Sequence, residues 1–185
     1  EGQTTSACSC SRQLKLEKLY QSSNLTKDPG IGFEHFQAAY YPEDNARELA
    51  GVDGPIRTHM LAVFERVRQF TERFSLSETR SLYLFGPTGT GKTFLAKCAG
   101  KALLEKGFTV LYLSAPALFE AARAAKFRDE DQPDAAEGYR RTLQANLLIL
   151  DDLGTEPASD SRYADLLSLL EERARPSREP RRTIM

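Results

Sequence analysis

Cysteine, net charge and long apolar runs are scarce in this sequence, and each shortage excludes a class of protein. Three cysteines among 185 residues are too few for the disulfide framework of a small secreted protein. The formal net charge of −1 provides no overall attraction to nucleic acid or to a membrane surface. No apolar run reaches the roughly eighteen residues of a membrane-spanning helix, and the amino terminus has no signal-peptide core. We therefore expect a cytoplasmic protein that does not associate with membranes.

The length and composition are typical of one globular domain. A chain of 185 residues can bury a substantial core, and its hydrophobic content of 41% and charged content of 28% are ordinary. The chain opens on Glu1 rather than on methionine, and residues 183–185 are typical of the start of another apolar strand. We interpret the sequence as an internal fragment of a longer protein.

Residues 86–93 read GPTGTGKT and match the phosphate-loop pattern G-x-x-x-x-G-K-[ST]. In this pattern backbone N–H groups wrap around phosphate oxygens, and glycine keeps side chains out of the wrap. Lys92 would supply the cation for the β- and γ-phosphates, and Thr93 would supply a hydroxyl for Mg²⁺. The predicted nucleotide-binding residues are Gly86, Pro87, Thr88, Gly89, Thr90, Gly91, Lys92, Thr93 and Phe94.

The flanking residues supply the strand and the helix that a phosphate loop requires. Residues 81–85 form a short, mostly apolar run, typical of a strand buried on both faces of a parallel sheet. After the loop, apolar residues recur at helical spacing as far as Gly107, a residue suited to a C-cap. We expect this helix to begin at about Lys92, so that its dipole and free N–H groups point at the phosphates. The alternative is a glycine-rich turn with an incidental lysine, which would require neither a strand before it nor a helix after it.

A second informative stretch ends in two carboxylates. Residues 147–150 are consecutive apolar residues, typical of a buried strand, and Asp151 and Asp152 follow them directly. In open α/β sheets, ligands bind at the carboxyl ends of the strands. One carboxylate there can hold Mg²⁺, and its neighbour can orient or activate the water that attacks the γ-phosphate. The alternative is an acidic turn that simply closes the strand.

Periodicity and turn signals predict the remaining elements. Asp53 is suited to cap a helix that has Pro55 in its first turn, and Ser114 is suited to cap a helix with Pro116 near its start. We expect helices over 12–21, 56–74 and 139–145, a strand over 109–113 and a loop over 127–137.

The last predicted helix follows the two carboxylates. Asp160 or Ser161 is expected to cap it. Its apolar residues recur at helical spacing, and they predict a core face made of Tyr163, Leu166, Leu167, Leu170 and Ala174.

An aromatic cluster near the amino terminus has two interpretations. Phe33, Phe36, Tyr40 and Tyr41 lie close together in the sequence, beside His35. We favour a segment that packs against the surface of the domain. Stacking on the adenine base is the alternative, as a secondary role.

Two cysteines one residue apart, Cys8 and Cys10, also have two interpretations. They are half of a four-thiolate Zn²⁺ site, or they are reduced thiols in a poorly ordered terminus. Within this sequence the second interpretation is favoured, because no second cysteine pair is present.

Five arginines lie within ten residues near the carboxyl end. They could contact the phosphates of a nucleic-acid strand, or they could be the solvated residues of a loop between a helix and a strand. The sequence does not favour either interpretation. The five are Arg173, Arg175, Arg178, Arg181 and Arg182.

Taken together, GPTGTGKT and LLILDDLG resemble the motifs of the AAA+ ATPases in the DnaC/DnaI helicase-loader and IstB transposition-helper group. The resemblance covers roughly residues 33–185 and includes the GFEHF segment, which is similar to an aromatic N-terminal linker of that group. It implies a three-layer α/β P-loop core with a parallel sheet, truncated before its fourth strand is complete. In that arrangement the fourth strand lies between the phosphate-loop strand and the Asp151 strand. We accordingly expect an N-terminal tail and linker over residues 1–32, a remnant of a cysteine-rich zinc region, and an AAA+ core over residues 33–185.

The resemblance also implies an activity and the residues that carry it. It implies a Mg²⁺-dependent ATPase that self-associates through its AAA+ core, with Lys92 and Thr93 at the phosphates and the metal. By position, Asp151 is the metal-associated carboxylate and Asp152 the catalytic, water-activating one. Many AAA+ proteins have glutamate at the second position, which is one methylene longer, although members of the loader group often share the aspartate. The group's sensor asparagine, arginine finger and helical lid would lie beyond Met185, so we expect weak binding and poor hydrolysis from this fragment alone.

The favoured function is ATP-dependent loading of a replicative DNA helicase onto DNA, with single-stranded DNA as a further partner. Cys8 and Cys10 support this choice, because they resemble the end of a cysteine-rich region found in some helicase loaders. The alternatives are ATP-dependent assistance of a transposase and a nucleotide-dependent binding switch with little turnover. A small-molecule phosphotransferase would need an acceptor pocket and a lid, and no stretch of the sequence indicates either.

Overall fold

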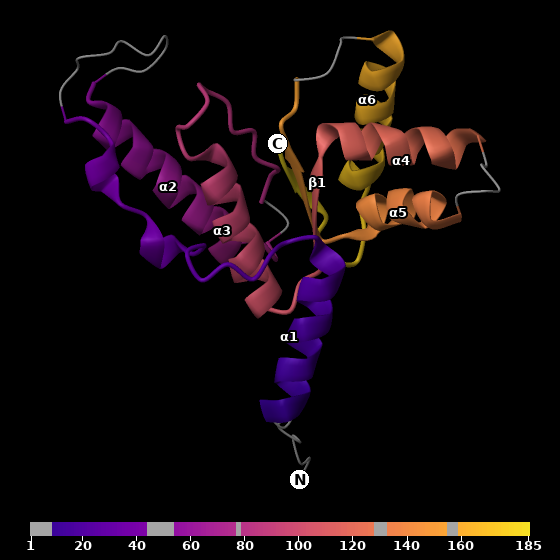
Figure 1. Cartoon of the computed structure of the whole chain (residues 1–185), viewed down its shortest axis with the longest axis horizontal. Helices are drawn as coiled ribbons and strands as arrows, with labels where there is room; N and C mark the ends of the chain where they lie inside the picture. Colours follow the sequence, from indigo (N-terminus) through magenta and orange to yellow (C-terminus); the bar gives the residue numbers. More distant parts are fainter. Residues whose placement is uncertain (1–8, 44–53, 77–78, 128–132, 155–158) are drawn as a thin grey trace.

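A parallel sheet lies between two groups of helices (Figure 1). The computed structural model describes residues 9–43, 54–76, 79–127, 133–154 and 159–185. Its three strands lie in the spatial order β1-β2-β3, and both pairs of neighbours are parallel. The strands therefore end at one common edge, as the sequence predicted for the carboxylates after residue 150. Their bounds are β1 Val110–Ser114, β2 Leu147–Asp151 and β3 Arg182–Ile184.

Residues 81–85 run beside β3 without forming a full strand, so the strand predicted there is only partly present. Leu82 forms a single parallel bridge with Ile184. Its N–H donates to the carbonyl of Thr183 at 2.9 Å, and its carbonyl accepts from the N–H of Met185 at 3.1 Å. This arrangement places β3 between the phosphate-loop segment and β2, as the resemblance implied.

The prediction that this segment is buried on both faces is wrong. Leu82 and Leu84 pack against the core, whereas Tyr83 and Phe85 are 63% and 80% exposed and stack on each other with centroids 5.8 Å apart. Buried and exposed side chains alternate along this segment because successive side chains of an extended segment point to opposite faces. The described residues cover only one of those faces.

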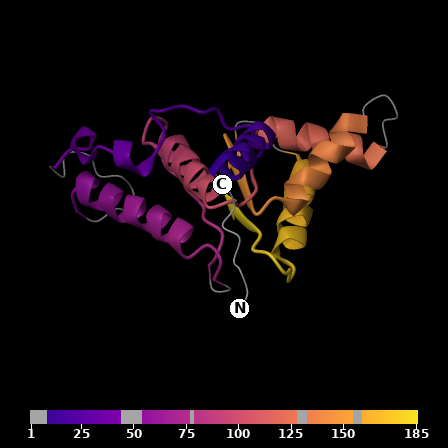
Figure 2. The ribbon, with the colours of Figure 1, turned by 90° about the horizontal axis from the view of Figure 1, so that it is seen from below.

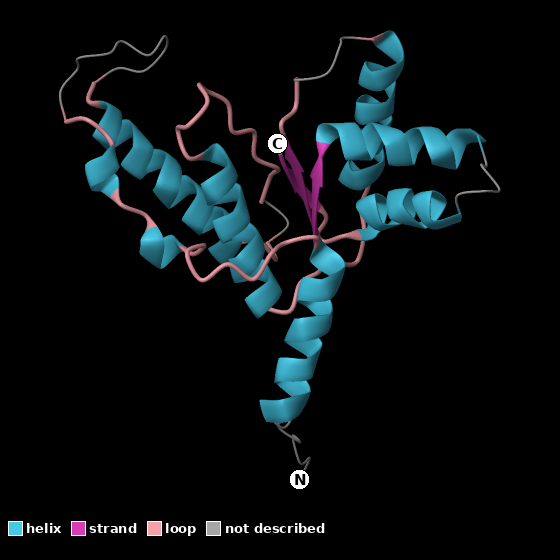
Figure 3. Cartoon of the chain, in the orientation of Figure 1, coloured by secondary structure: helices cyan, strands magenta, loops and turns pink. Residues whose placement is uncertain are grey.

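Six α-helices and two short 3₁₀ turns surround the sheet in the described residues (Figures 2 and 3). Figure 2 shows α2 and α3 on one side of the sheet and α4, α5 and α6 on the other. Helix α1 projects from the body, and the side chains of Leu16, Leu19 and Tyr20 anchor it to the core. The bounds are α1 Ser9–Ser23, α2 Ile56–Glu72, α3 Lys92–Glu105, α4 Ala115–Phe127, α5 Pro133–Gln144 and α6 Asp160–Ala174.

Alternate residues of the central strand enter two separate cores, which gives the three layers that the resemblance implied. Leu147 and Ile149 of β2 pack with the helices α2 and α3, whereas Leu148 and Leu150 pack with α4 and α6. Each of these four side chains is at most 2% exposed. Burial of one such side chain contributes roughly 1.5–3 kcal/mol, so the central strand contributes strongly to both cores.

Several helix boundaries differ from the prediction for identifiable reasons. Helix α5 begins at Pro133, inside the expected loop, because proline suits a first helical position, where the missing N–H needs no partner. Helix α6 is capped by Ser159, whose hydroxyl accepts from the N–H of Arg162, and not by Asp160 or Ser161. Helix α2 begins at Ile56 with Pro55 as its N-cap, so the predictions of an Asp53 cap and of Pro55 in the first turn are wrong; Asp53 itself lies outside the described residues.

Helix α6 turns only part of the predicted face to the core: Leu166 packs there and Leu170 is half-buried. Tyr163 and Leu167 are 64% and 58% exposed, and Ala174 is exposed. The fully buried residues of this helix are Leu169 and Arg173. The predicted core face contained only leucine, tyrosine and alanine side chains, whereas the guanidinium of Arg173 finds hydrogen-bond acceptors inside the protein.

Candidate nucleotide-binding site

The loop at residues 86–91 has the backbone that a phosphate loop needs. Gly86, Gly89 and Gly91 all have positive φ, and Gly91, with φ of 91°, directly precedes the first residue of α3. A Cβ at Gly91 would also lie 2.8 Å from the hydroxyl oxygen of Tyr41. Glycine is therefore required at 91 both by conformation and by space. Helix α3 begins at Lys92, as predicted, so its free N–H groups face the loop.

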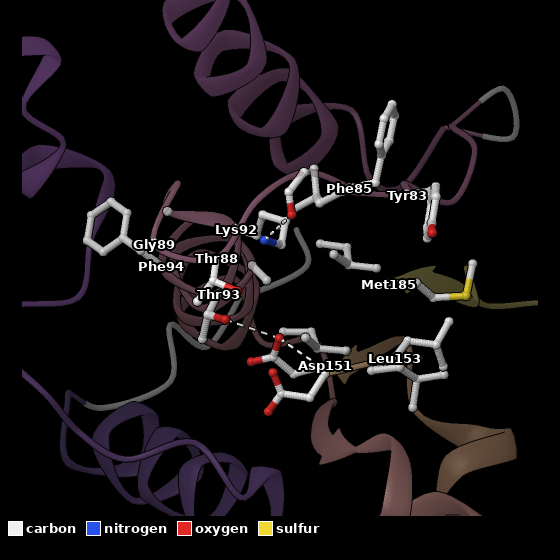
Figure 4. Close-up of a pocket in the computed structure, with 18 residues that line it drawn as sticks. Tyr83, Phe85, Thr88, Gly89, Lys92, Thr93, Phe94, Asp151, Leu153 and Met185 are labelled. Atoms are coloured by element: carbon white, nitrogen blue, oxygen red, sulfur yellow. Dashed lines mark hydrogen bonds between the residues drawn. The ribbon is translucent and has the colours of Figure 1, made fainter. Parts of the chain in front are cut away.

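Lys92 and Thr93, in the first turn of α3, contact the phosphate loop and the end of β2, respectively. The ammonium of Lys92 donates to the carbonyls of Gly86 and Pro87, both at 2.8 Å. The hydroxyl of Thr93 donates to Oδ1 of Asp151 at 3.1 Å. Figure 4 shows this hydrogen bond crossing from the helix to the end of β2. The structure thus brings together a lysine, a threonine and a carboxylate from positions far apart in the sequence.

Asp151 is held on its other side by a residue that the sequence did not indicate. The hydroxyl of Tyr112, from β1, donates to Oδ2 of Asp151 at 2.6 Å. Burial, and then the hydrogen bond to Asp151, raise the pKa of Tyr112, so this hydroxyl remains a donor at neutral pH. The ammonium of Lys97 lies over the ring of Tyr112 at 5.1 Å from its centroid. A signal was present in the sequence, since a tyrosine in a neighbouring strand has a polar end that requires a partner.

Asp152 leaves the strand conformation immediately after Asp151. Its φ is 57°, in the left-handed region that aspartate tolerates better than most residues, and its N–H donates to Oδ1 of Asp151 at 3.1 Å. Both carboxylates line the same cavity of about 580 Å³, together with Lys92 and Thr93 (Figure 4).

A second cavity of about 890 Å³ lies on the other side of the loop, where the aromatic segment approaches it. Phe36 stacks on Phe64 of α2 at 4.3 Å between centroids and on Tyr41 at 5.8 Å. The packing interpretation is therefore confirmed for this part of the segment. The contact with the phosphate loop was not predicted: the hydroxyl of Tyr41 donates to the carbonyl of Thr90 at 3.1 Å. Tyr40, by contrast, is 76% exposed at the cavity.

The zinc prediction stays a prediction. Cys8 lies outside the described residues, and Cys10 is exposed in the first turn of α1. The described part of the chain contains no cluster of three or more side chains that could hold a metal ion.

Comparison with known proteins places the chain in a family. The model of the family of IstB-like ATP binding proteins matches residues 65–178, more than half of the chain. The chain belongs to this family. An ATP-binding protein of insertion sequence IS1162 from Pseudomonas fluorescens is 36% identical over 103 residues, which are 54% of this chain and 41% of that protein. The replicative helicase loader DnaI of Bacillus subtilis is 29% identical over 148 residues, which are 80% of this chain and 43% of that protein.

Solved structures confirm the fold of this IstB-like chain. DnaA from Aquifex aeolicus with bound AMPPCP has a TM-score of 0.56 at 19% identity, covering 85% of this chain and 42% of that one. A protein described as a primosome component of Streptococcus pyogenes has a TM-score of 0.51 at 22% identity. The match covers 93% of this chain and 78% of that one. The predicted AAA+ P-loop fold is therefore confirmed. The chain spans about two fifths of the length of the curated relatives named above. None of its described helices is long and apolar enough to cross a membrane.

Proposed function

We propose that this protein is a Mg²⁺-dependent ATPase that loads a replicative helicase onto DNA. The hydrogen bond between Thr93 and Asp151 carries the proposal for the chemistry, because it joins the phosphate loop to the end of β2 inside one cavity. A hydroxyl and a carboxylate are the hard oxygen ligands that Mg²⁺ prefers, so these two residues fit the metal. Membership of an ATP-binding family agrees with this use of the cavity.

Each residue of the site has a distinct proposed role. Thr93 and Asp151 would hold Mg²⁺, directly or through water, and Tyr112 would keep the Asp151 carboxylate in one orientation. Bound Mg²⁺ would neutralise charge on the β- and γ-phosphates. Lys92 would exchange its contacts with the loop carbonyls for contacts with those phosphates. Asp152 would accept a proton from the attacking water, or orient that water, at the same cavity.

The aromatic segment is proposed to bind the base. The cavity beside Tyr40 and Tyr41 opens next to the loop residues that would wrap the phosphates. Aromatic rings provide a face on which a purine can stack, and Tyr41 already fixes the segment to Thr90. An adenine there would lie adjacent to its own phosphates.

The breadth of the similarity supports a helicase as the partner. The alignment with DnaI covers 80% of this chain, whereas that with the IS1162 protein covers 54%. The family model and the higher identity of the insertion-sequence relative support a second candidate, assistance of a transposase. A nucleotide-dependent switch with little turnover is the third possibility.

The ATPase proposal is tested with a fluorescent ATP analogue in the full-length protein. Lys92→Ala should weaken binding sharply, because it removes the cation at the phosphates, while Lys18→Ala, an exposed lysine on α1, should leave the affinity unchanged. Equal affinities in the two variants would overturn the site assignment.

A second variant separates turnover from binding. Asp152→Asn should keep ATP bound but abolish phosphate release in a coupled assay. If helicase delivery to single-stranded DNA continued undiminished in this variant, the switch would replace the hydrolytic cycle. If the protein stimulated a transposase and never delivered a helicase, the second candidate would be correct.

A further inference from the structure

A second charged pocket lies away from the nucleotide site. It has a volume of about 540 Å³ and is built from two loops, one before residues 82–84 and one between α6 and β3. Both loops lead into the starts of parallel neighbours, so the pocket lies at the amino edge of the sheet. The cavity with Asp151 lies at the carboxyl edge. Ligands of the two pockets would therefore not compete for the same residues.

The pocket collects arginines that the sequence places in two segments. Four of the five from the carboxyl-end cluster line it, and Arg80 joins them from the other loop. Arg173 does not line it, because its side chain is buried among backbone carbonyls. The single acidic residue among the described lining residues is Glu179, and one of its oxygens accepts from the side-chain amide of Asn146 at 3.1 Å.

These positive charges are poorly neutralised by the described residues. Among the described residues, Arg175 is the only one of the five lining arginines that forms an ion pair, with Glu172 at 2.7 Å. The Nε atoms of Arg181 and Arg182 are buried without a hydrogen-bond partner among the described residues. Burial, and then repulsion by the charge of Arg80, lower the pKa of Arg182. An anion in the pocket would relieve this repulsion.

The composition of the lining indicates which anion fits. Guanidinium groups match phosphate with two parallel hydrogen bonds, and Ser75 and Ser81 add hydroxyl donors. Among the described residues that line the pocket there is no aromatic ring and no large aliphatic side chain, so they offer no platform for a base and no apolar centre for a protein partner. Interfaces with nucleic acid are polar and positive, and several arginines in two segments suit several phosphates along a strand.

We propose that this pocket, lined by Arg80, Arg175, Arg178, Arg181 and Arg182, binds the phosphate backbone of a nucleic-acid strand without reading its sequence. The site is separate from the ATP site and does not require hydrolysis. The arginine-rich stretch thus has two roles: Arg173 is a structural residue, and the others form a phosphate-binding surface.

The test measures anisotropy of a labelled oligothymidine, without nucleotide, over a range of salt concentrations. The variant is Arg80→Gln with Arg178→Gln, because both side chains are exposed and lack an ion pair in the described residues. The matched control is Arg66→Gln with Arg123→Gln, which removes the same charge from exposed positions on α2 and α4. The pocket variant should lose about ten-fold in affinity, and its salt slope should fall by roughly 1.4, because each contact to single-stranded DNA contributes about 0.7.

Two results would overturn the proposal. One is an equal loss in the pocket variant and the control, which would mean that only total charge matters. The other is displacement of the oligonucleotide by a polyglutamate peptide at equal charge concentration, which would identify the pocket as a docking site for an acidic protein segment. Binding of the fluorescent ATP analogue should be unchanged in both variants, so failure here leaves the ATP site untouched.

Discussion

Arg173 makes a strong prediction about stability, because its buried guanidinium donates to several acceptors inside the protein. It donates to the carbonyls of Thr142 and Arg182 at 2.6 Å and of Ala145 at 2.9 Å, and to the hydroxyl of Thr183 at 3.1 Å. The side chain therefore connects α5, α6 and β3. Replacement by methionine, which is similar in length and apolar, would remove the guanidinium donor from all of these buried acceptors.

The magnitude follows from the number of acceptors. Each unsatisfied buried acceptor costs about 1–3 kcal/mol, and the substitution removes the donor from several of them. Arg173→Met recovers part of this cost, because burial and the neighbouring Arg181 and Arg182 disfavour the charge that the substitution removes. We expect a loss of about 4 kcal/mol, which at a urea dependence near 2 kcal/mol per molar lowers the midpoint of unfolding by about 2 M.

Charge and pH do not complicate this measurement near neutrality. Burial, with Arg181 and Arg182, lowers the pKa of Arg173 to about 9, so the guanidinium stays charged at pH 7. The folded state binds this proton less tightly than the unfolded chain. The resulting penalty is therefore constant below about pH 9 and is relieved only as the pH rises above it.

The assay is urea unfolding followed by circular dichroism, with Arg175→Met as the control. Arg175 is exposed, and its ion pair with Glu172 should contribute less than about 1 kcal/mol. Arg173→Lys should fall between the two, because one ammonium cannot reach all the acceptors, and it provides a measurement if the methionine variant does not fold. Equal midpoints for Arg173→Met and Arg175→Met would refute the reasoning.

Three further predictions concern single residues. Tyr112→Phe removes the donor to the proposed metal carboxylate and should weaken Mg²⁺ about ten-fold, measured by Mg²⁺ titration of fluorescent-ATP binding; an unchanged affinity would contradict the positioning role. Gly91→Ala should destabilise the fold by roughly 1–2 kcal/mol through positive φ alone, and by more through contact with the nearby tyrosine hydroxyl. Gly89 also has positive φ, but a Cβ there would meet no atom within 4 Å, so Gly89→Ala should lower the urea midpoint less than Gly91→Ala. A larger loss in Gly89→Ala would exclude the steric argument. Burial raises the pKa of Cys98 to about 11, so iodoacetamide at pH 8 should modify Cys10 in the native protein and spare Cys98, as mass spectrometry can show; comparable labelling of both would mean that α3 opens readily.

Local patterns predicted the parts of the fold that depend on neighbouring residues. The phosphate loop needs glycines with positive φ followed by a helix, and the eight residues 86–93 contain both the glycines and the start of the helix. The strand that ends at Asp151 is equally predictable from its sequence, because four consecutive apolar residues suit a position between two layers of helices. The roles assigned to Lys92, Thr93 and Asp152 stay proposals, as does the division of the chain at residue 32.

The errors concern contacts between distant residues. No local pattern shows that Arg173 meets carbonyls from α5, so its burial and the rotation of α6 were missed. The contact of Tyr112 with Asp151 joins residues 39 positions apart and depends on the strand register. Residues 81–85 look like a fully buried strand, but their burial depends on elements that must cover both faces. In each case the missing information is tertiary.

The position of β3 has a consequence for the order in which the protein is made. Among the described residues, the segment before the phosphate loop is paired through β3 rather than directly with β2. Leu82 and Ile184 are about one hundred residues apart, and synthesis proceeds at about 5–20 residues per second. The segment before the loop is therefore translated roughly 5–20 s before its pairing partner. During that interval the nascent chain holds the segment before its nucleotide loop without the strand that pairs with it, so this edge of the sheet forms only when residues 182–184 have been made.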